Sequence, residues 1–360
     1  MFRKIITVAT LVLVVLVIWS VRDNIAQAFG YLANTNLLFV LLLIPEQILL
    51  YYCSGQIFFS YLTAKITNRN ARQAKQFSPW FLARVSFELN FVNQAVPSGG
   101  FAGLSYVAWR LRPLGSSVGQ TSFMYALRYV ITILTNQLQT ALALLALILL
   151  GGISDSAWWV IGLTGLACAG IILGLIIIVV IASSRKRISW FTSLITKIIN
   201  STVKIATFGH KRQLLSHATI EKHFDDIHRD LTTARQNKRI LVRPILWGII
   251  YSFLEVGAYW LVSIGMGHPE ILPHIIVAGA IASVVGIILM TPGGLGGYEG
   301  AMIFVLSALG IETGLATAVV ITTRVIVLLG TLSGGYIFYQ NAVSKIGKAE
   351  RAQIMSKGNK

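Results

Sequence analysis

Two arginines stand inside apolar stretches of this 360-residue chain, where a charge is hard to accommodate. Arg128 lies about eight residues from the nearer end of its stretch and Arg324 about nine, or roughly 12 to 14 Å at the helical rise. A charge at that depth of a membrane costs several kcal/mol unless it is paired or hydrated, so each arginine is a functional candidate. Because a guanidinium fork suits a phosphate, the pair predicts a site for an anionic headgroup.

A motif rich in glycine precedes each arginine, at 96–103 and at 291–300. Gly99-Gly100 in the first aligns with Gly293-Gly294 in the second. Proline and glycine break a regular helix, and in hydrocarbon a broken backbone is tolerated only where protein or a water-filled cavity satisfies it. Helix starts also present N–H groups to anions. We therefore expect both motifs to line an interior site.

Glutamates accompany the arginines in both halves. Glu46 and Glu255 could balance the arginines, recognise an amine on a headgroup, or carry a proton, and the sequence leaves these roles open. A structural alternative pairs the arginines with Glu88 or Glu299 or lets them reach the membrane surface. Asn93 and Ser98 could contact ligand or only cap a helix.

The predicted substrate-binding residues are Arg128, Arg324, Asn93, Ser98, Gly99, Gly100, Pro292, Gly293, Gly294, Gly296, Gly297, Glu299, Glu46 and Glu255. We expect no catalytic residue, no metal ligand and no cofactor.

The composition is that of a polytopic membrane protein, with 55% hydrophobic residues, 12% charged residues and a mean hydropathy of +0.72. We expect one transmembrane domain over residues 1–360. Cys53 and Cys168 lie inside apolar segments and predict no disulfide framework.

The net charge of +17 does not indicate nucleic-acid binding, because the basic residues cluster between apolar segments. Of the 30 Lys and Arg residues, 27 fall at 3–4, 65–84, 110–112, 185–243 and 345–360. Basic loops mark the cytoplasmic side. The pattern predicts an inner (plasma) membrane protein with both termini in the cytoplasm and a basic cytoplasmic loop at 183–243.

The same pattern predicts two inverted repeats, residues 1–182 and residues 244–360. In an all-α fold, each half holds a re-entrant or discontinuous helix pair broken by glycine, at 85–109 and at 275–310. Six crossings complete the topology, at 5–19, 37–62, 120–150, 158–182, 244–266 and 315–340. If the arms of a hairpin cross fully, eight or more spans result.

The segments Asn93–Gly100 and Thr291–Glu299 resemble the two signature segments of the flippase-like family, also described as the lysylphosphatidylglycerol synthase transmembrane region. The resemblance covers nearly the whole chain. The resemblance implies that, in the multiple peptide resistance factor, a similar membrane region moves aminoacylated phospholipid. A separate soluble domain of that protein synthesises the lipid, and we expect this domain to be missing here. The chain departs from the common pattern at Ser98–Phe101, where many relatives carry a more polar turn, and this leaves the headgroup preference open.

Three functions remain open at this stage. The leading hypothesis is a lipid translocator for anionic or aminoacylated phospholipid or polyprenyl phosphate. The alternatives are a membrane-embedded transferase that modifies lipid and a non-catalytic scaffold that binds lipid and a lipid-synthesising partner enzyme. A homodimer is also compatible with the sequence, and no nucleic-acid partner is expected.

Overall fold

The computed structural model describes residues 30–66, 78–96, 100–150, 157–182, 236–289 and 296–358, apart from residue 32, and four isolated positions between 184 and 232. The described part is helical and contains no strand, which confirms the all-α prediction. The α-helices are α3 (Leu37–Leu41), α4 (Leu43–Ile66), α6 (Pro79–Ala95), α7 (Phe101–Leu111), α8 (Val118–Leu149), α9 (Trp158–Ala182), α12 (Arg239–Gly265), α13 (Leu272–Leu289), α14 (Gly297–Ala308) and α15 (Thr313–Gly358). Two short 3-10 helices are η1 (Arg112–Leu114) and η3 (Pro269–Ile271).

Six helical segments of the described part are long and apolar enough to cross a membrane. Five correspond to predicted crossings, and the sixth, Pro269–Leu289, belongs to the predicted second hairpin. The predicted first crossing, 5–19, lies outside the described residues. The chain is therefore a multi-pass helical membrane protein, and Pro269–Leu289 is a candidate span within the predicted second hairpin.

Local sequence explains where several helices begin. The Ser78 hydroxyl accepts a hydrogen bond from the Phe81 N–H at 3.1 Å, and Pro79 occupies the first helical position of α6. At the start of α8, Ser117 and Gln120 form a reciprocal capping box. Helix α12 begins at Arg239, five residues before the predicted crossing, and accommodates Pro244 in its interior.

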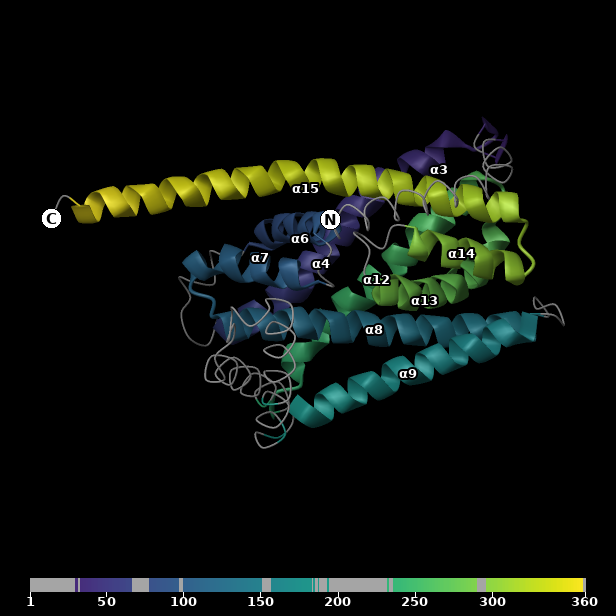
Figure 1. Ribbon diagram of the computed structural model, residues 1–360, viewed down its shortest axis with the longest axis horizontal. Helices are drawn as coiled ribbons and strands as arrows, with labels where there is room; N and C mark the ends of the chain where they lie inside the picture. Colours follow the sequence, from purple (N-terminus) through teal and green to yellow (C-terminus); the bar gives the residue numbers. More distant parts are fainter. Residues whose placement is uncertain are drawn as a thin grey trace, which may run out of the picture.

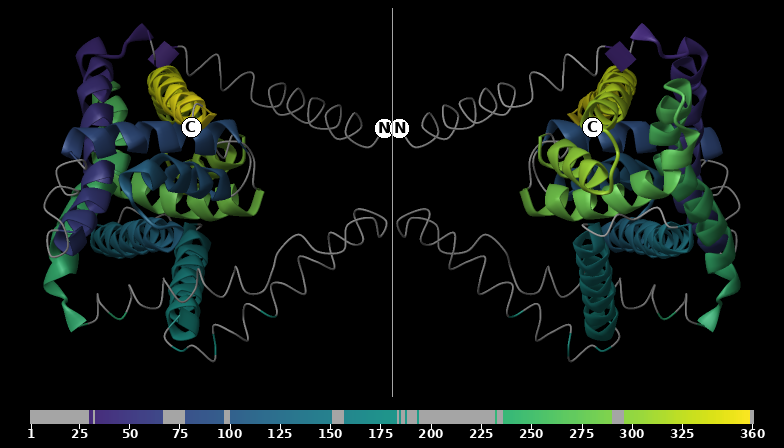
Figure 2. Two further views of the ribbon diagram at one scale, coloured as in Figure 1. Left: turned by 90° about the vertical axis from the view of Figure 1, so that its left-hand side faces the viewer. Right: turned by 90° about the vertical axis from the view of Figure 1, so that its right-hand side faces the viewer.

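The helices follow the same order twice along the chain. A long helix (α4 or α12) is followed by a pair of shorter ones (α6–α7 or α13–α14) and then by a long helix that carries an arginine (α8 or α15). Figure 1 shows α6 and α7 toward one end of the molecule and α13 and α14 toward the other. Seen end-on, the two pairs lie between α8 and α15, with α4 and α12 along one side (Figure 2).

Each pair of shorter helices has its own apolar core. Around α6 and α7 the buried residues include Leu89, Val107 and Leu111, and around α13 and α14 they include Ala278 and Leu306. A third, smaller cluster contains Tyr51, Ile131 and Tyr251, from α4, α8 and α12. The two motif-bearing pairs are thus packed separately, and long helices connect them.

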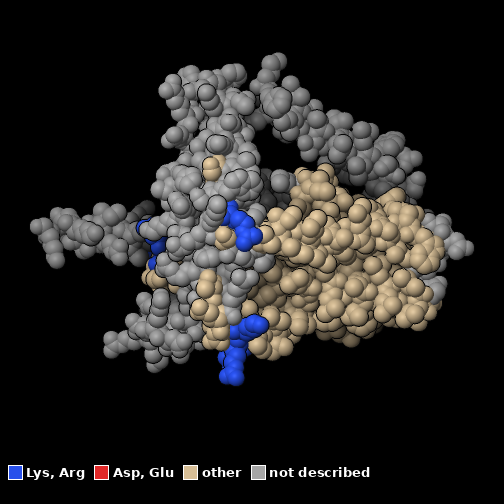
Figure 3. Space-filling model, turned by 90° about the horizontal axis from the view of Figure 1, so that it is seen from below, with Lys and Arg blue, Asp and Glu red and all other residues tan. Residues whose placement is uncertain are grey.

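The outer surface suits a lipid environment. Helix α9 has a mean hydropathy of 2.6 over its candidate span, and only 6% of that stretch is buried in the protein. On the face shown in Figure 3, the Lys and Arg side chains gather at one end, and the rest of the described surface shows neither basic nor acidic residues. Apolar side chains on the outside of a helix bundle are favourable only in contact with lipid or another protein.

Candidate functional site

Both motif helices start at a glycine with a left-handed backbone. Gly100, with φ +92°, precedes α7, and Gly296, with φ +84°, precedes α14. Arg128 follows Gly100 by 28 residues, and Arg324 follows Gly296 by 28 residues. In the structure, Gly100 therefore corresponds to Gly296 as the residue before a helix. The sequence alignment paired Gly100 with Gly294, two residues earlier.

Parts of both motifs lie outside the described residues, 97–99 in the first and 290–295 in the second. Five predicted site residues fall there: Ser98, Gly99, Pro292, Gly293 and Gly294. Their predicted role in binding stays a prediction.

Asn93 stabilises the break between α6 and α7. Its Oδ1 atom accepts a hydrogen bond from the Gly103 N–H at 3.0 Å, and its amide donates to the Tyr125 hydroxyl at 3.3 Å. That hydroxyl in turn donates to the Gly100 carbonyl at 2.8 Å. A Cβ at residue 103 would overlap the Asn93 amide, so glycine is required there. Of the two roles considered for Asn93, these contacts correspond to capping.

Glu299 joins the start of α14 to Arg324. One carboxylate oxygen accepts the Gly296 N–H at 2.7 Å, and the other accepts the Arg324 Nε–H at 2.5 Å. Glu299 is buried, and the Arg324 guanidinium carbon also lies 4.9 Å from the ring centre of Tyr298. The pairing that the sequence offered as a structural alternative is therefore present in the second half. Next to it, a Cβ at Gly297 would overlap Leu289 of α13.

Arg128 has a different environment. It is 6% exposed, and within the described part of the chain no carboxylate lies within ion-pair distance of it. The guanidinium carbon lies 5.5 to 6.0 Å from the ring centres of Tyr251, Phe58 and Tyr129, and one terminal nitrogen donates to the Tyr251 hydroxyl at 3.5 Å. Aromatic faces stabilise a cation but leave most of the guanidinium donors available.

The predicted alternative of an Arg128–Glu88 pair is wrong. The Glu88 carboxylate, 2% exposed, accepts hydrogen bonds from the Tyr106 hydroxyl at 2.7 Å and from Arg110 Nε at 3.1 Å. Arg110 lies near the end of α7, so this pair ties α6 to α7. The two halves thus use their glutamates differently, and Arg128 is left without the partner that Arg324 has.

A polar pocket, the central pocket, lies where the two halves meet. It has a volume of about 150 Å³ and is lined by residues of α4, α6, α12, α14 and α15. Arg324, Tyr298 and Glu255 line it directly, and Tyr251, which also lines it, accepts a hydrogen bond from Arg128. The structure therefore places Arg324 and one of the predicted glutamates on the pocket, with Arg128 behind Tyr251.

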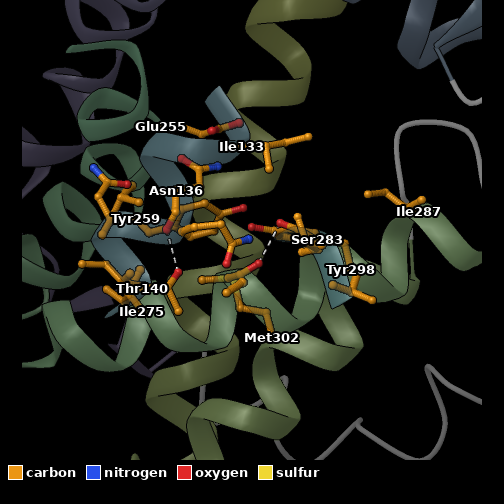
Figure 4. A pocket seen from close by; sticks show the side chains of 18 residues that line it. Ile133, Asn136, Thr140, Glu255, Tyr259, Ile275, Ser283, Ile287, Tyr298 and Met302 are labelled. Atoms are coloured by element: carbon orange, nitrogen blue, oxygen red, sulfur yellow. Dashed lines mark hydrogen bonds between the residues drawn. The ribbon is translucent and has the colours of Figure 1, made fainter. Parts of the chain in front are cut away.

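A second space, the side cavity, adjoins the central pocket (Figure 4). It measures about 200 Å³ and shares Glu255, Tyr259 and Tyr298 with the central pocket. Its wall away from these residues is mainly apolar and includes Ile171 of α9 and Ile287 of α13, which is 70% exposed. The two spaces thus share three lining residues, and the side cavity extends from them toward the apolar outside.

Glu46 and Glu255 differ in their access to this site. Glu255 is an exposed side chain that lines both spaces. Glu46 is buried, one of its oxygens accepts a hydrogen bond from the Gln47 amide at 2.9 Å, and the other has no partner. Gln47, and not Glu46, lines the central pocket.

Sequence reasoning missed a group of uncharged residues on α8. Asn136, Gln137, Gln139 and Thr140 all line the side cavity, between Ile133 and the outer end of the helix. Five of the six residues at 135–140 are polar, and the nine residues that follow them in α8 are all apolar. That local density of polar side chains is the signal that could have found them, because unpaired amides in hydrocarbon are unfavourable.

Searches of curated proteins and of solved structures find no match to this chain. The site combines a guanidinium with no carboxylate partner among the described residues, a carboxylate open to a cavity, and broken helices beside a polar pocket. Such groups can hold a charged headgroup inside a membrane. The sequence profile of the family described as "Lysylphosphatidylglycerol synthase TM region" matches residues 5–334, and the chain belongs to that family.

Proposed function

We propose that this protein is a lipid translocator that passes phospholipid or a related anionic lipid between leaflets through the central pocket. The observation that carries the proposal is the adjacency of the two spaces: a polar pocket with both arginines nearby shares lining residues with a cavity that has an apolar outer wall. A lipid has the same division between a charged headgroup and apolar chains. Movement across the bilayer requires that the headgroup find polar partners at depth.

The proposal assigns unequal roles to the arginines. Arg128 contacts the phosphate, because its donors face aromatic rings and one tyrosine hydroxyl, and no carboxylate among the described residues lies within ion-pair distance of it. Arg324 holds Glu299 and the start of α14, and its side chain lines the central pocket. Glu255 lies in both spaces, where it can meet an amine or hydroxyl of the headgroup.

We further propose that the two halves are inverted repeats with re-entrant helix pairs. The repeated helix order, the matched spacing of Gly100 to Arg128 and of Gly296 to Arg324, and the placement of α6–α7 and α13–α14 toward opposite ends support this (Figure 1). In such a fold the binding site lies at the repeat interface near mid-membrane, and rocking of one half against the other exposes it alternately.

The proposed setting is an inner (plasma) membrane with both termini in the cytoplasm. The gathering of Lys and Arg at one end of the molecule, on the face seen in Figure 3, supports that orientation. The proposed partners are the transported lipid and an enzyme that synthesises it.

Reconstitution tests this function. The purified chain is placed in liposomes that contain a phospholipid with a fluorophore on one acyl chain, and an impermeant reductant bleaches the label in the outer leaflet. We expect bleaching to proceed beyond half of the label with wild-type protein, and an Arg128→Ala/Arg324→Ala variant to lose at least nine-tenths of the protein-dependent rate.

The matched control is Arg243→Ala, which removes an exposed arginine from the first turns of α12, away from both spaces. It should retain the wild-type rate. Equal rates for the double variant and the control would contradict the proposed site. Formation of a modified lipid by the wild-type protein, with no transbilayer movement, would instead support a transferase.

A further inference from the structure

The side cavity contains a concentration of uncharged hydrogen-bonding groups that the translocation of a phosphate does not require. Asn136, Gln137, Gln139 and Thr140 lie within five residues of α8, and Ser283 of α13 lines the same space. Side-chain amides each offer two donors and two acceptor sites. A hydroxyl also donates and accepts, so such groups can pair with it in both directions.

Three of these amides have an atom without a partner. Asn136 Oδ1, Gln137 Oε1 and Gln139 Nε2 are buried and make no hydrogen bond, and Gln139 as a whole is only 5% exposed. A buried polar atom that lacks a partner is unfavourable, so most such atoms in native proteins are satisfied by protein, water or ligand. The Asn136 side chain also forms a hydrogen bond with Glu255, while the amides of Gln137 and Gln139 can rotate to place either atom toward a ligand in the cavity.

The rest of the lining fits the same ligand chemistry. Tyr259 and Tyr298 present aromatic surface where the cavity joins the central pocket, and Glu255 offers a carboxylate acceptor there. A volume of about 200 Å³ exceeds the share of a single water, about 30 Å³. The space therefore suits a compact group that carries several hydroxyls.

We propose that the side cavity is a subsite for a polyhydroxylated lipid headgroup, a glycerol or sugar group, whose hydroxyls bond to the α8 amides. The proposal rests on the translocation function above and specifies its substrate class. The source of the hydroxyls is a lipid and not a free sugar, because the outer wall of the cavity is apolar and reaches the exposed residue Ile287.

The transport assay with three headgroups tests this subsite. The probes share one fluorescent acyl chain and carry phosphoglycerol, glucose or phosphocholine, the last of which has no hydroxyl on its headgroup. We expect wild-type protein to move the phosphoglycerol and glucosyl lipids at least tenfold faster than the phosphocholine lipid. An Asn136→Leu/Gln139→Leu variant should move the two hydroxyl-bearing lipids about tenfold more slowly and leave the phosphocholine rate unchanged.

Gln56→Leu is the matched control, since Gln56 is a buried amide whose Nε2 also lacks a partner but which lines neither space. It should not alter the order of the three lipids. Equal rates for all three lipids, unaffected by the amide variant, would overturn the subsite and leave translocation standing.

A binding measurement separates the two failures. Equilibrium dialysis with radiolabelled glycerophosphoglycerol or methyl glucoside is performed on the detergent-solubilised chain. If no lipid moves but a headgroup binds, and the amide variant loses at least tenfold in affinity, the subsite holds and translocation is rejected. If neither movement nor binding occurs, both proposals are overturned.

Discussion

At the scale of single residues, the two arginines that look equivalent in the sequence have different partners. Arg324 donates to Glu299, which also accepts the Gly296 N–H, so charge and backbone are satisfied together. Arg128 is surrounded by Phe58, Tyr129 and Tyr251. Removing one partner of a buried ion pair leaves an uncompensated charge, whereas removing a buried charge that has no ionic partner does not.

This difference predicts opposite effects of matched substitutions. Arg324→Gln should destabilise the protein by about 3–5 kcal/mol, because it leaves Glu299 buried without its partner. Arg128→Gln should keep or raise the thermal unfolding temperature in detergent while it slows lipid movement.

A double variant, Glu299→Gln/Arg324→Gln, completes the experiment. It should recover most of the stability lost in Arg324→Gln, since glutamine can still accept the Gly296 N–H. If Arg128→Gln and Arg324→Gln lower the unfolding temperature equally, the assigned asymmetry is wrong.

The residue types near the site were predictable from sequence, but their pairings were not. Isolated charges in apolar stretches identified Arg128, Arg324 and Glu255, which the structure brings to the central pocket directly or through Tyr251. The choice of Arg110 as the partner of Glu88 depends on how α7 packs against α6, and sequence spacing does not contain that information. The α8 amides carry no charge, so a search based on charge passed over them.

At the scale of helices, the breaks define where polar groups can exist inside the bundle. The glycines at the starts of α7 and α14 were predicted as breakers, and both Gly100 and Gly296 adopt backbones that other residues rarely adopt. Helix α13 with η3 is long enough to cross a membrane, which is compatible with the alternative in which the arms of a hairpin cross fully. Length and composition alone do not distinguish a hairpin arm from a span. The topology of the α13–α14 pair therefore depends on how its helices are oriented in the membrane.

Glycine-to-alanine variants test the role of the breaks. Gly296→Ala meets no atom of the described residues within 4 Å, so its expected effect is the strain of a positive φ, about 1–3 kcal/mol. It should lower the unfolding temperature by several degrees. Gly170→Ala, in the middle of α9 and also without a neighbour within 4 Å, should leave stability unchanged or raise it. Equal unfolding temperatures for the two variants would show that Gly296 is not needed for its backbone.

At the scale of the whole molecule, the expected family is confirmed over residues 5–334, and the chain is a multi-pass helical membrane protein. The hydrophobic pattern made this predictable, because apolar segments of about 20 residues are typical of transmembrane helices. The arrangement of the two halves was not fixed by the pattern, since helix packing in lipid depends on close side-chain fit and on local polar contacts.

The proposed orientation makes a direct prediction for the two ends of α12. Lys238 precedes this helix and Glu270 follows it, and both are exposed. Single cysteines at these positions, in a chain whose Cys53 and Cys168 have been replaced, should react with an impermeant maleimide from opposite sides. Lys238→Cys should be labelled only in inside-out vesicles. Glu270→Cys should be labelled only in cells whose plasma membrane is intact, where the reagent reaches the outer face of that membrane. The reverse pattern would place the termini outside.

The most direct test of the central claim is to block the side cavity in a working vesicle. Ser283 and Ser333 are both exposed helical serines that bond the carbonyl four residues earlier, but only Ser283 lines the cavity. In the cysteine-free chain, Ser283→Cys and Ser333→Cys are each modified with a bulky methanethiosulfonate reagent after reconstitution, and lipid movement is measured. If the headgroup passes through the side cavity, lipid movement by modified Ser283→Cys should fall to the rate seen without protein. Modified Ser333→Cys should move lipid at the same rate as before modification. Undiminished movement by fully modified Ser283→Cys would contradict the account.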